Sequence, residues 1–472
     1  MEKFNELLDN ANSILAEFEK FKELGLIPKS GDFYPAGVHY PPITMYENIN
    51  QDQFYRDYSP IKKGEYDIYV HIPFCRRRCV FCHYPSLYAA KDHVKDRYLD
   101  YLSKEIDLYT DYVVKQKIHA RTILIGGGTP TDLSPEQLRK FLKYFTEKIN
   151  TESNIQFNYD IDPSTITGED GIERLKIMKE FGVDRLTIGV QSFNDHILKK
   201  MNRDHDRHIA FESVENSMKY GFQTNIEFIF GYPGQDIQAW YEDMKCAVDT
   251  GVDEIQMYRL KTLPYGDQEG IINKIKQQHP ERLPSNEEAM LMKKIAIDYL
   301  AENGYHENLR RVFTKSKKFI SKYAYNQCCI LQEEIGFGLT AFGSLKDRFY
   351  LNTQNFDEYY RKIDNDELPI NRGIIRSRDE QERWAIILPL KNYWINRKIF
   401  NNRCGAQISE QHMKKLNALE KAGLLKIEDK KIELTKLGAF FADEVVTQFS
   451  DKKYLPYAES EYAHGELSPY QV

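Results

Sequence analysis

The sequence lacks any apolar run long enough to cross a membrane, and its first residues, MEKFNELLDN, lack the apolar core of a signal peptide. It also lacks a basic surplus, because 65 Lys and Arg face 71 Asp and Glu and leave a net charge of −6. Proteins that bind nucleic acid usually carry a basic footprint, so we expect neither nucleic acid nor a membrane as a partner. Cysteine is scarce, with 7 among 472 residues, and four of the seven follow no disulfide pattern. We therefore expect a cytoplasmic protein with reduced thiols.

The other three cysteines form the most informative motif in the chain. Cys75, Cys79 and Cys82 have C-x3-C-x2-C spacing within DIYVHIPFCRRRCVFCHYP, directly after an apolar alternating run. Three thiolates within eight residues can converge on one soft metal centre, and thiolates are the preferred ligands of iron–sulfur clusters. Three ligands leave one iron of a cubane cluster open, and an open position is typical of a reactive metal centre. The alternatives are a zinc knuckle completed by His83 and a chance grouping of surface cysteines.

The central part of the chain alternates short β-branched runs with helical patterns at intervals of roughly 30–50 residues. This alternation predicts right-handed βαβ units around a parallel sheet, and six such units suit a partial (β/α)6 TIM-like barrel. The predicted strands are 67–72, 121–125, 156–161, 185–190, 224–230 and 254–259, and the predicted helices between them are 94–115, 135–149, 171–181, 207–220 and 237–250.

Changes in composition predict four segments. Residues 1–62 form an N-terminal helix with an irregular lead-in, and residues 63–305 form the α/β barrel core. Residues 306–376 form a connecting segment on the substrate side. Residues 377–472 form a mostly helical C-terminal domain, in which a helix is followed by a short hairpin and a second helix. That order favours a winged-helix-like cap with a structural role.

Polar and glycine-rich segments follow the predicted strands. In parallel sheets of this kind the working residues lie at the carboxyl ends of the strands. The cysteines follow the first strand, and GGGTPT at 126–131 follows the second. The triple glycine permits a close approach of backbone N–H groups to a ligand, although a plain turn has the same composition. It is not a phosphate-binding P-loop, because the Lys–Ser/Thr pair of that motif is missing.

Several charged or amide side chains lie at the same predicted edge. Asp160 and Glu227 can accept hydrogen bonds from ribose hydroxyls or an amino group, and Gln191 can both donate and accept. Arg203 and Arg259 can bind carboxylates with two parallel hydrogen bonds. For each of these charged residues an ordinary structural ion pair is the alternative interpretation.

Taken together, the motifs resemble those of a known family. YVHIPFCRRRCVFC, GGGTPT, DIDP, RLTIGVQSFND with MNRDHD, and NIEFIFGYPGQ are similar to those of the radical S-adenosylmethionine (SAM) superfamily. Within it, the chain resembles the oxygen-independent coproporphyrinogen III oxidase-like family from about residue 35 onwards, including the later stretch GFGLTAFGS.

The resemblance implies a [4Fe–4S] cluster held by Cys75, Cys79 and Cys82, with the open iron chelated by SAM. It implies that one-electron reduction cleaves SAM and yields a 5′-deoxyadenosyl radical, which abstracts hydrogen from an unactivated carbon. It also implies one SAM, and a possible second. The residues implied around the first SAM are Tyr69, Phe81, Gly126, Gly127, Gly128, Thr129, Asp160 and Phe342, and those implied around the second are Gln191, Arg203, Glu227 and Lys261.

The chain also departs from the family pattern. Tyr84 stands where the oxidases usually have a further cysteine, and Asp160 and Glu227 exchange the family's Glu and Asp. Lys261 stands where a small residue is expected, and HENLRR at 306–311 replaces a GMDHFA-type segment. These departures bear on the substrate and leave the radical chemistry intact.

Three functions remain open at this point. The first is oxidative decarboxylation of a tetrapyrrole, with Arg259, Arg310 and Arg311 holding propionates and a flavodoxin- or ferredoxin-like protein as the one-electron reductant. The second is a radical methyltransferase that uses two SAM molecules, a class that includes haem-opening relatives. The third is a non-catalytic haem chaperone, although the HN-x-x-Y haem motif of those relatives is not evident here.

Overall fold

The computed structural model describes residues 2–34, 37, 39–262 and 270–471. Within these residues one large mixed sheet has the strand order β1-β15-β14-β13-β12-β2-β5-β6-β7-β8-β9-β11-β10. Its strands are β1 Glu47–Asn48, β2 Glu65–Ile72, β5 His119–Gly127, β6 Asn150–Ile161, β7 Arg185–Gln191, β8 Gln223–Phe230, β9 Glu254–Arg259, β10 His306–Leu309, β11 Val312–Thr314, β12 Glu334–Phe337, β13 Phe342–Leu345, β14 Arg348–Asn352 and β15 Ile370–Ile375.

The six predicted strands are confirmed as β2, β5, β6, β7, β8 and β9, and they pair in parallel in chain order. A seventh parallel strand, β12, extends the sheet beyond β2. The antiparallel strands β13, β14, β15 and β1 continue that side, while β11 and β10 continue the sheet beyond β9. The predicted α/β class with a parallel barrel-like core is therefore correct.

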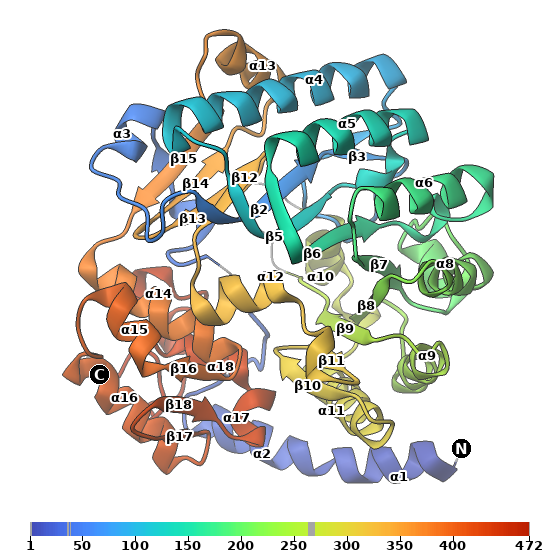
Figure 1. Cartoon of the computed structure of the whole chain (residues 1–472). Helices are drawn as coiled ribbons and strands as arrows, with labels where there is room; N and C mark the ends of the chain where they lie inside the picture. The colour runs from blue at the N-terminus through green and yellow to red at the C-terminus, as the bar shows by residue number, and fades with distance from the viewer. Residues whose placement is uncertain (1, 35–36, 38, 263–269, 472) are drawn as a thin grey trace.

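Amphipathic helices cover the outer face of the parallel strands (Figure 1). Ser134 begins one of them with a reciprocal capping box to Gln137, and Asp206 and Asp236 accept hydrogen bonds from backbone N–H groups of the first turn of two others. Their apolar sides pack on the strands and form the larger core. These helices are α4 Asp92–Tyr109, α5 Pro135–Lys148, α6 Gly168–Glu180, α8 Arg207–Lys219 and α9 Ile237–Asp249.

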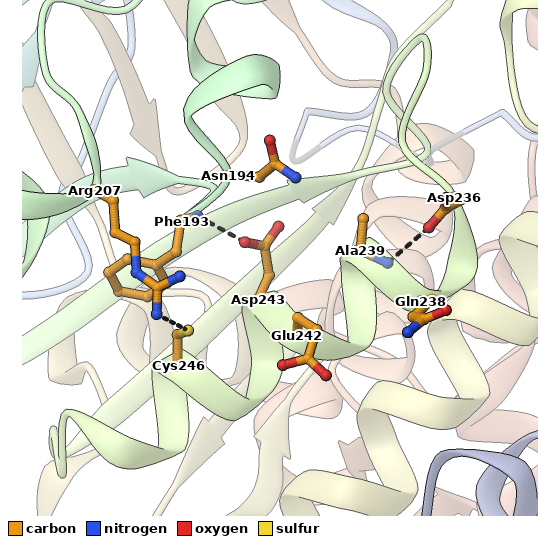
Figure 2. Close-up of a pocket in the computed structure, with 9 residues that line it drawn as sticks. All are labelled: Phe193, Asn194, Arg207, Asp236, Gln238, Ala239, Glu242, Asp243 and Cys246. Atoms are coloured by element: carbon orange, nitrogen blue, oxygen red, sulfur yellow. Dashed lines mark hydrogen bonds between the residues drawn. The ribbon is translucent and has the colours of Figure 1, made fainter. Parts of the chain in front are cut away.

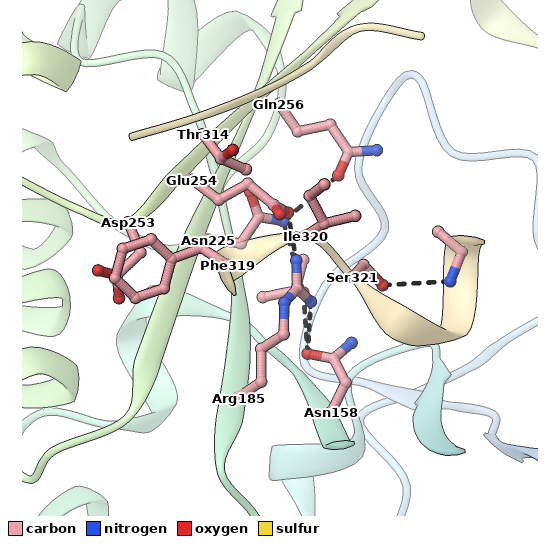
Figure 3. Close-up of polar contacts among 12 residues, drawn as sticks. Asn158, Arg185, Asn225, Asp253, Glu254, Gln256, Thr314, Phe319, Ile320 and Ser321 are labelled. Carbon is pink, nitrogen blue, oxygen red and sulfur yellow. Dashed lines mark hydrogen bonds and ion pairs between the residues drawn. The ribbon is translucent and has the colours of Figure 1, made fainter. Parts of the chain in front are cut away.

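Residues 319–321 lie near the start of β7 and β9, close to Arg185 and Glu254, and we call them the barrel floor (Figure 3). The Gln156 side chain donates to the carbonyl of Ile320 at 3.3 Å and accepts from the Lys322 N–H at 2.7 Å. Gln223 donates to the carbonyl of the first floor residue. Since the strand ends are tied to this segment, the barrel opens at the carboxyl ends of its strands.

The C-terminal part forms a small domain with a three-stranded sheet in the order β16-β18-β17. A helix followed by this antiparallel wing agrees with the predicted winged-helix-like domain. Its elements are α14 Arg378–Lys391, β16 Trp394–Asn396, α15 Arg397–Cys404, α16 Glu410–Lys421, β17 Leu425–Ile427, β18 Lys431–Leu434, α17 Lys436–Phe440 and α18 Ala442–Thr447.

The N-terminal helices join this domain to the barrel. Phe21 is fully buried, with its ring 5.1 Å from that of Phe441, and Phe18 and Leu7 enter the same second core as Ile295. The remaining helices are α1 Glu2–Ala11, α2 Ser13–Glu23, α3 Gln51–Tyr55, α7 Asp195–Lys200, α10 Ile271–Gln278, α11 Asn286–Glu302, α12 Lys322–Tyr325 and α13 Phe356–Asp364.

The predicted segment boundaries after residues 62, 305 and 376 stay predictions, and the large sheet takes strands from the first three segments. A search of the described helices finds none with the length and apolar character that crossing a bilayer requires.

Candidate active site

The three clustered cysteines lie in a loop at the open end of the barrel. β2 ends at Ile72, and the chain then forms β3 (Phe74–Cys75), which pairs with β4 (Leu87–Tyr88). The Cys82 N–H donates to the Cys79 carbonyl at 3.2 Å, so the loop turns back on itself between these two residues. All three thiols are free and partly buried. Burial, followed by the nearby Cys82 and Cys79, raises the pKa of Cys75 to about 11, so a bound cation would favour the anionic form of the Cys75 thiol.

Arg203 supplies a positive charge to this loop. Its Nη1 donates to the Sγ of Cys79 at 3.1 Å, and its Nη2 contacts Asp162 Oδ2 at 2.8 Å and the Gly189 carbonyl at 2.7 Å. Burial alone would lower the pKa of Arg203, but the charges of Asp162 and Cys79 outweigh it and hold that pKa above its usual value. The structure thus places Arg203 against a cysteine of the predicted cluster. Its predicted contact with a second SAM stays a prediction.

The glycine loop lies directly on the cysteine loop. The Gly128 N–H donates to the Ile72 carbonyl at 2.9 Å, and the Thr129 N–H donates to the Phe74 carbonyl at 2.6 Å. A Cβ on Gly128 would lie 2.6 Å from the Phe74 oxygen and 2.8 Å from the Cys75 sulfur. Only glycine fits at this distance, so the triple glycine is a close-packing requirement rather than a plain turn. Gly127 beside it has a left-handed backbone, with φ 118°.

The rings of Tyr69, Phe342 and His39 pack together beside the glycine loop, and we call them the aromatic wall. Tyr69 of β2 stacks on Phe342 of β13 with ring centroids 5.4 Å apart, and its hydroxyl lies 2.8 Å from Nδ1 of His71. His39 from the N-terminal lead-in meets the other side of Phe342 edge-on at 4.4 Å. Two of the residues expected around the first SAM, far apart in sequence, are therefore in contact.

Two carboxyl groups face the interior at the same end of the barrel. Asp160 lies against the glycine loop, because a Cβ on Gly126 would be 2.4 Å from its Oδ2. Burial and then the charge of Glu227 raise the pKa of Asp160 to about 8. Burial raises the pKa of Glu227 to about 7, although the Tyr258 hydroxyl donates to its Oε1 at 3.1 Å. The site therefore favours one shared negative charge over two.

A buried arginine, Arg185, lies near Asn158 and Glu254 (Figure 3). Arg185 of β7 donates to Asn158 Oδ1 at 2.8 Å and forms an ion pair with Glu254 of β9. Its positive charge acts on the carboxyls of Asp160 and Glu227 and lowers their pKa values. Sequence reasoning missed this network. The available signal was the occurrence of charged and amide residues within strands that are buried on both faces.

β7 ends at Gln191, whose backbone is left-handed at φ 68°, and a loop follows it. Asp243 of α9 fixes this loop, because its carboxylate accepts from the Phe193 N–H at 2.7 Å and from the Ser192 hydroxyl at 2.8 Å. Asp243 also lines a cavity of about 270 Å³ whose other walls are the start of α8, α9 and the loop before α7 (Figure 2). These residues affect the site through the position of Gln191 and lie apart from the cysteine loop.

The remaining predicted residues occupy different surroundings. Phe81 packs in a small apolar cluster with Ile197 and Tyr232, where it supports the back of the cysteine loop. Tyr84 is 60% exposed. Burial, followed by the charges of Cys82 and Glu227, raises its pKa to about 12, which places the ring at the open end of the barrel. Lys261 follows β9, and its charge interacts with the predicted propionate-binding Arg310 and Arg311 and with His83 of the cysteine loop.

The donor set fits a cluster that carries SAM. The three thiols provide soft ligands, and Arg203 donates a hydrogen bond to the sulfur of Cys79. The glycine loop packs against the sulfur of Cys75, so its backbone can approach a ligand closely. Across the part of the chain that the structure describes, no three Cys, His, Asp or Glu side chains are already arranged as a metal site.

Comparison with known proteins agrees with this site. A family model of the radical SAM superfamily matches residues 69–247. The oxygen-independent coproporphyrinogen III oxidase of Helicobacter pylori is 25% identical over 459 residues, covering 92% of this chain and 96% of the relative. The haem chaperone HemW of Bacillus subtilis is 27% identical over 388 residues, covering 81% of this chain and 98% of the relative.

The solved structures agree on the fold. Coproporphyrinogen III oxidase (HemN) from Escherichia coli, described as a radical SAM enzyme, aligns with a TM-score of 0.75 and 22% identity over 88% of this chain and 96% of its own. The relatives' names support an oxidoreductase. The chain is therefore similar to the radical SAM superfamily over residues 69–247 and, over most of its length, to the oxygen-independent coproporphyrinogen III oxidases.

Proposed function

We propose that this protein is a radical SAM enzyme that removes hydrogen from a carbon of a carboxylated tetrapyrrole, in the manner of oxidative propionate decarboxylation. The observation that carries the proposal is the contact between the cysteine loop, the glycine loop and Arg203 at the open end of the barrel. Cys75, Cys79 and Cys82 would hold a [4Fe–4S] cluster, and the glycine loop and the aromatic wall would hold SAM. With both bound and one electron added, the site supplies a 5′-deoxyadenosyl radical.

In this scheme the protein's own residues bind and orient the cofactors and shield them from water. Arg203 donates a hydrogen bond to a ligand sulfur, and such bonds stabilise the reduced form of a cluster. Asp160, against the glycine loop, would accept hydrogen bonds from the cofactor, which Arg185 assists by favouring its charged form. The barrel floor keeps water from the interior on the side away from the cysteines.

Two observations support a tetrapyrrole with carboxylate groups. The relatives that match over most of their length include oxidases named for coproporphyrinogen III and haem chaperones. Arg259, Arg310, Arg311 and Lys261 gather at the carboxyl ends of the same strands, where they would attract anionic groups. A flavodoxin- or ferredoxin-like protein would supply the electron, and an acceptor is needed for the electron left when carbon dioxide departs.

The test is anaerobic turnover of the reconstituted protein with SAM and a reductant, with coproporphyrinogen III in one arm and haem in the other. We expect 5′-deoxyadenosine and a product that has lost two carboxyl groups. Cys79→Ala should abolish 5′-deoxyadenosine formation, whereas Cys404→Ala, which changes a partly buried cysteine of the C-terminal domain, should retain it.

Other products would point to the alternatives. A gained methyl group with S-adenosylhomocysteine, or an opened macrocycle, would identify a methyltransferase that uses two SAM molecules. Stable haem binding without 5′-deoxyadenosine would identify a chaperone like the HemW relatives. No 5′-deoxyadenosine with either substrate would exclude both enzymatic functions.

A further inference from the structure

A group of basic side chains converges where the barrel meets the C-terminal domain. Each of the six carries a charge that interacts with Asp443 of α18, and the other carboxyls whose charges act on members of this group are Glu307, Glu444 and Asp32. Buried positive charge in such excess is costly unless an anion compensates it. The six basic residues, which we call the cation cluster, are Arg259, Lys261, Lys293, Arg310, Arg311 and Lys391.

The cation cluster repels itself. Burial, followed by the charges of Arg311 and Arg310, lowers the pKa of Lys261 to about 8. Burial, followed by Arg310, lowers the pKa of Lys391 to about 7. These groups would regain their ordinary charge if carboxylates entered among them, so the surroundings favour a ligand with more than one negative charge.

Asp443 is the carboxylate that binds two arginines of the cation cluster. Arg310 donates to it through both Nε, at 2.7 Å, and Nη2, and Arg311 Nη2 donates to its Oδ2 at 2.9 Å. Burial alone would raise the pKa of Asp443, but the two guanidinium groups outweigh it and hold that pKa well below its usual range. This is the geometry in which two arginines bind a free carboxylate.

The turn that carries the two arginines is strained. Arg311 has a left-handed backbone with φ 69°, although it is not glycine, and its own N–H donates to Glu307 at 2.8 Å. Such strain persists where the surroundings impose it and is frequent at ligand-binding positions. The strained turn between β10 and β11 aims both guanidinium groups at one point.

The cation cluster is connected to the aromatic wall. Burial, followed by the charges of Lys391, Arg376 and Lys261, lowers the pKa of His39 to about 3, so His39 borders the cluster. Its ring meets Phe342 at 4.4 Å, and Phe342 stacks on Tyr69 beside the glycine loop. The Nδ1 of His39 is buried and finds no partner within the described residues. A ligand of macrocycle size at the cluster would therefore reach the wall of the SAM site.

Segments from both ends of the chain cover the cluster. The Phe33 ring lies between the guanidinium groups of Arg259 and Arg311, with centroid distances of 4.9 and 5.3 Å. Phe33, Phe440 and Glu444 line a small cavity together with both arginines. Neither covering segment belongs to the parallel strands of the barrel.

We propose that the cation cluster binds the carboxylates of the substrate and that Asp443 is an internal carboxylate which the substrate displaces. The inference rests on the proposed function, because it assumes a substrate with several carboxylates. Asp443 lowers the affinity for that substrate by occupying its site, and its release from the two arginines frees α18 to move away from the barrel mouth. The C-terminal domain is then a substrate-responsive cover.

The experiment measures binding of coproporphyrin III, a fluorescent tetracarboxylate, and of its tetramethyl ester to the reconstituted protein. In Asp443→Asn we expect the tetracarboxylate to bind about tenfold more tightly and the ester to bind as in the wild type, because an internal competitor has been removed. Asp379→Asn, which breaks the pair with Arg383 in α14 of the same domain, is the matched control and should change neither affinity.

A folded Asp443→Asn protein that binds the tetracarboxylate no more tightly than the wild type would overturn the inference. If that variant does not fold, the double variant Arg310→Gln/Arg311→Gln decides. Its preference for the tetracarboxylate over the ester should fall at least about fivefold, and an unchanged preference would overturn the inference. Wild-type protein that binds the tetracarboxylate without making 5′-deoxyadenosine would refute the proposed radical function and leave the binding result intact.

Discussion

Asp160 is the residue whose ionisation is most affected by the barrel. Its carboxyl faces that of Glu227, and the charge of Arg185 acts on both. The pKa of Asp160 is about 8 in the fold and 3.8 in its absence. A carboxyl with a raised pKa stabilises the fold fully below its unfolded pKa, and that contribution is lost as the pH rises through the folded value.

Asp160→Asn should therefore gain stability relative to the wild type as the pH rises. We expect the difference in free energy of unfolding to move by about 3 kcal/mol in favour of the variant between pH 5 and pH 8, since each pKa unit is worth about 1.4 kcal/mol. Urea denaturation of the cluster-free protein at both pH values measures this.

Asp162→Asn is the control, because the pKa of Asp162 is shifted the other way. Burial opposes ionisation there, but Arg203 outweighs it and lowers the pKa, so the ionised form stabilises the fold above pH 4. The control should be destabilised at both pH values. An Asp160→Asn protein that gains nothing at pH 8 would show that the pKa of Asp160 is not raised in the fold.

At the scale of elements, the cysteine loop and the glycine loop fix each other's position. Backbone hydrogen bonds join them at Gly128 and Thr129, and the Cys75 sulfur closes the space in which a side chain would stand. A change in either loop should therefore appear as a change in metal binding.

Gly128→Ala should lower the iron content by more than half while leaving the fold intact, because its Cβ would collide with the Phe74 carbonyl and the Cys75 sulfur. Iron per chain after reconstitution, with circular dichroism for the fold, measures this. Gly182→Ala is the matched control. A Cβ at Gly182 would meet no atom within 4 Å, and the backbone there is left-handed at φ 85°. The variant should therefore retain full iron at a stability cost of about 1 kcal/mol. Full iron loading of Gly128→Ala would contradict the assigned packing.

The strands that alternate with helices were predictable because each is an apolar run bounded by turn residues. β12 was not, since Gly336 and Gly338 interrupt its apolar pattern and its pairing with β2 joins segments more than 250 residues apart. A separation of 133 residues likewise hid the ion pair between Arg310 and Asp443. Short motifs revealed the cysteine and glycine loops, whereas Arg185 has no motif and required the fold.

At the scale of the whole molecule, the N-terminal helices hold the barrel and the C-terminal domain together. Phe21 is fully buried against Phe441, so this segment is part of the core rather than an appendage. The N-terminal helices and the C-terminal domain therefore determine together how firmly that domain is held against the barrel.

Phe21→Ala should lower the free energy of unfolding by about 3–5 kcal/mol, because a large buried ring leaves a cavity. Phe4→Ala, which removes a partly buried ring 5.4 Å from Tyr241, should cost clearly less. Urea denaturation followed by tryptophan fluorescence compares them. Equal losses in the two variants would mean that the N-terminal helices dock as a loose surface layer.

The barrel floor has a kinetic consequence. Because residues 319–321 are hydrogen-bonded to Gln156 near the amino-terminal end of the barrel, we expect ligands to enter and leave at the carboxyl ends of the strands. Whatever binds deepest must then arrive first and depart last. We expect steady-state turnover to follow a compulsory order, with SAM before the larger substrate, and fragments of SAM to remain trapped until the larger product has gone.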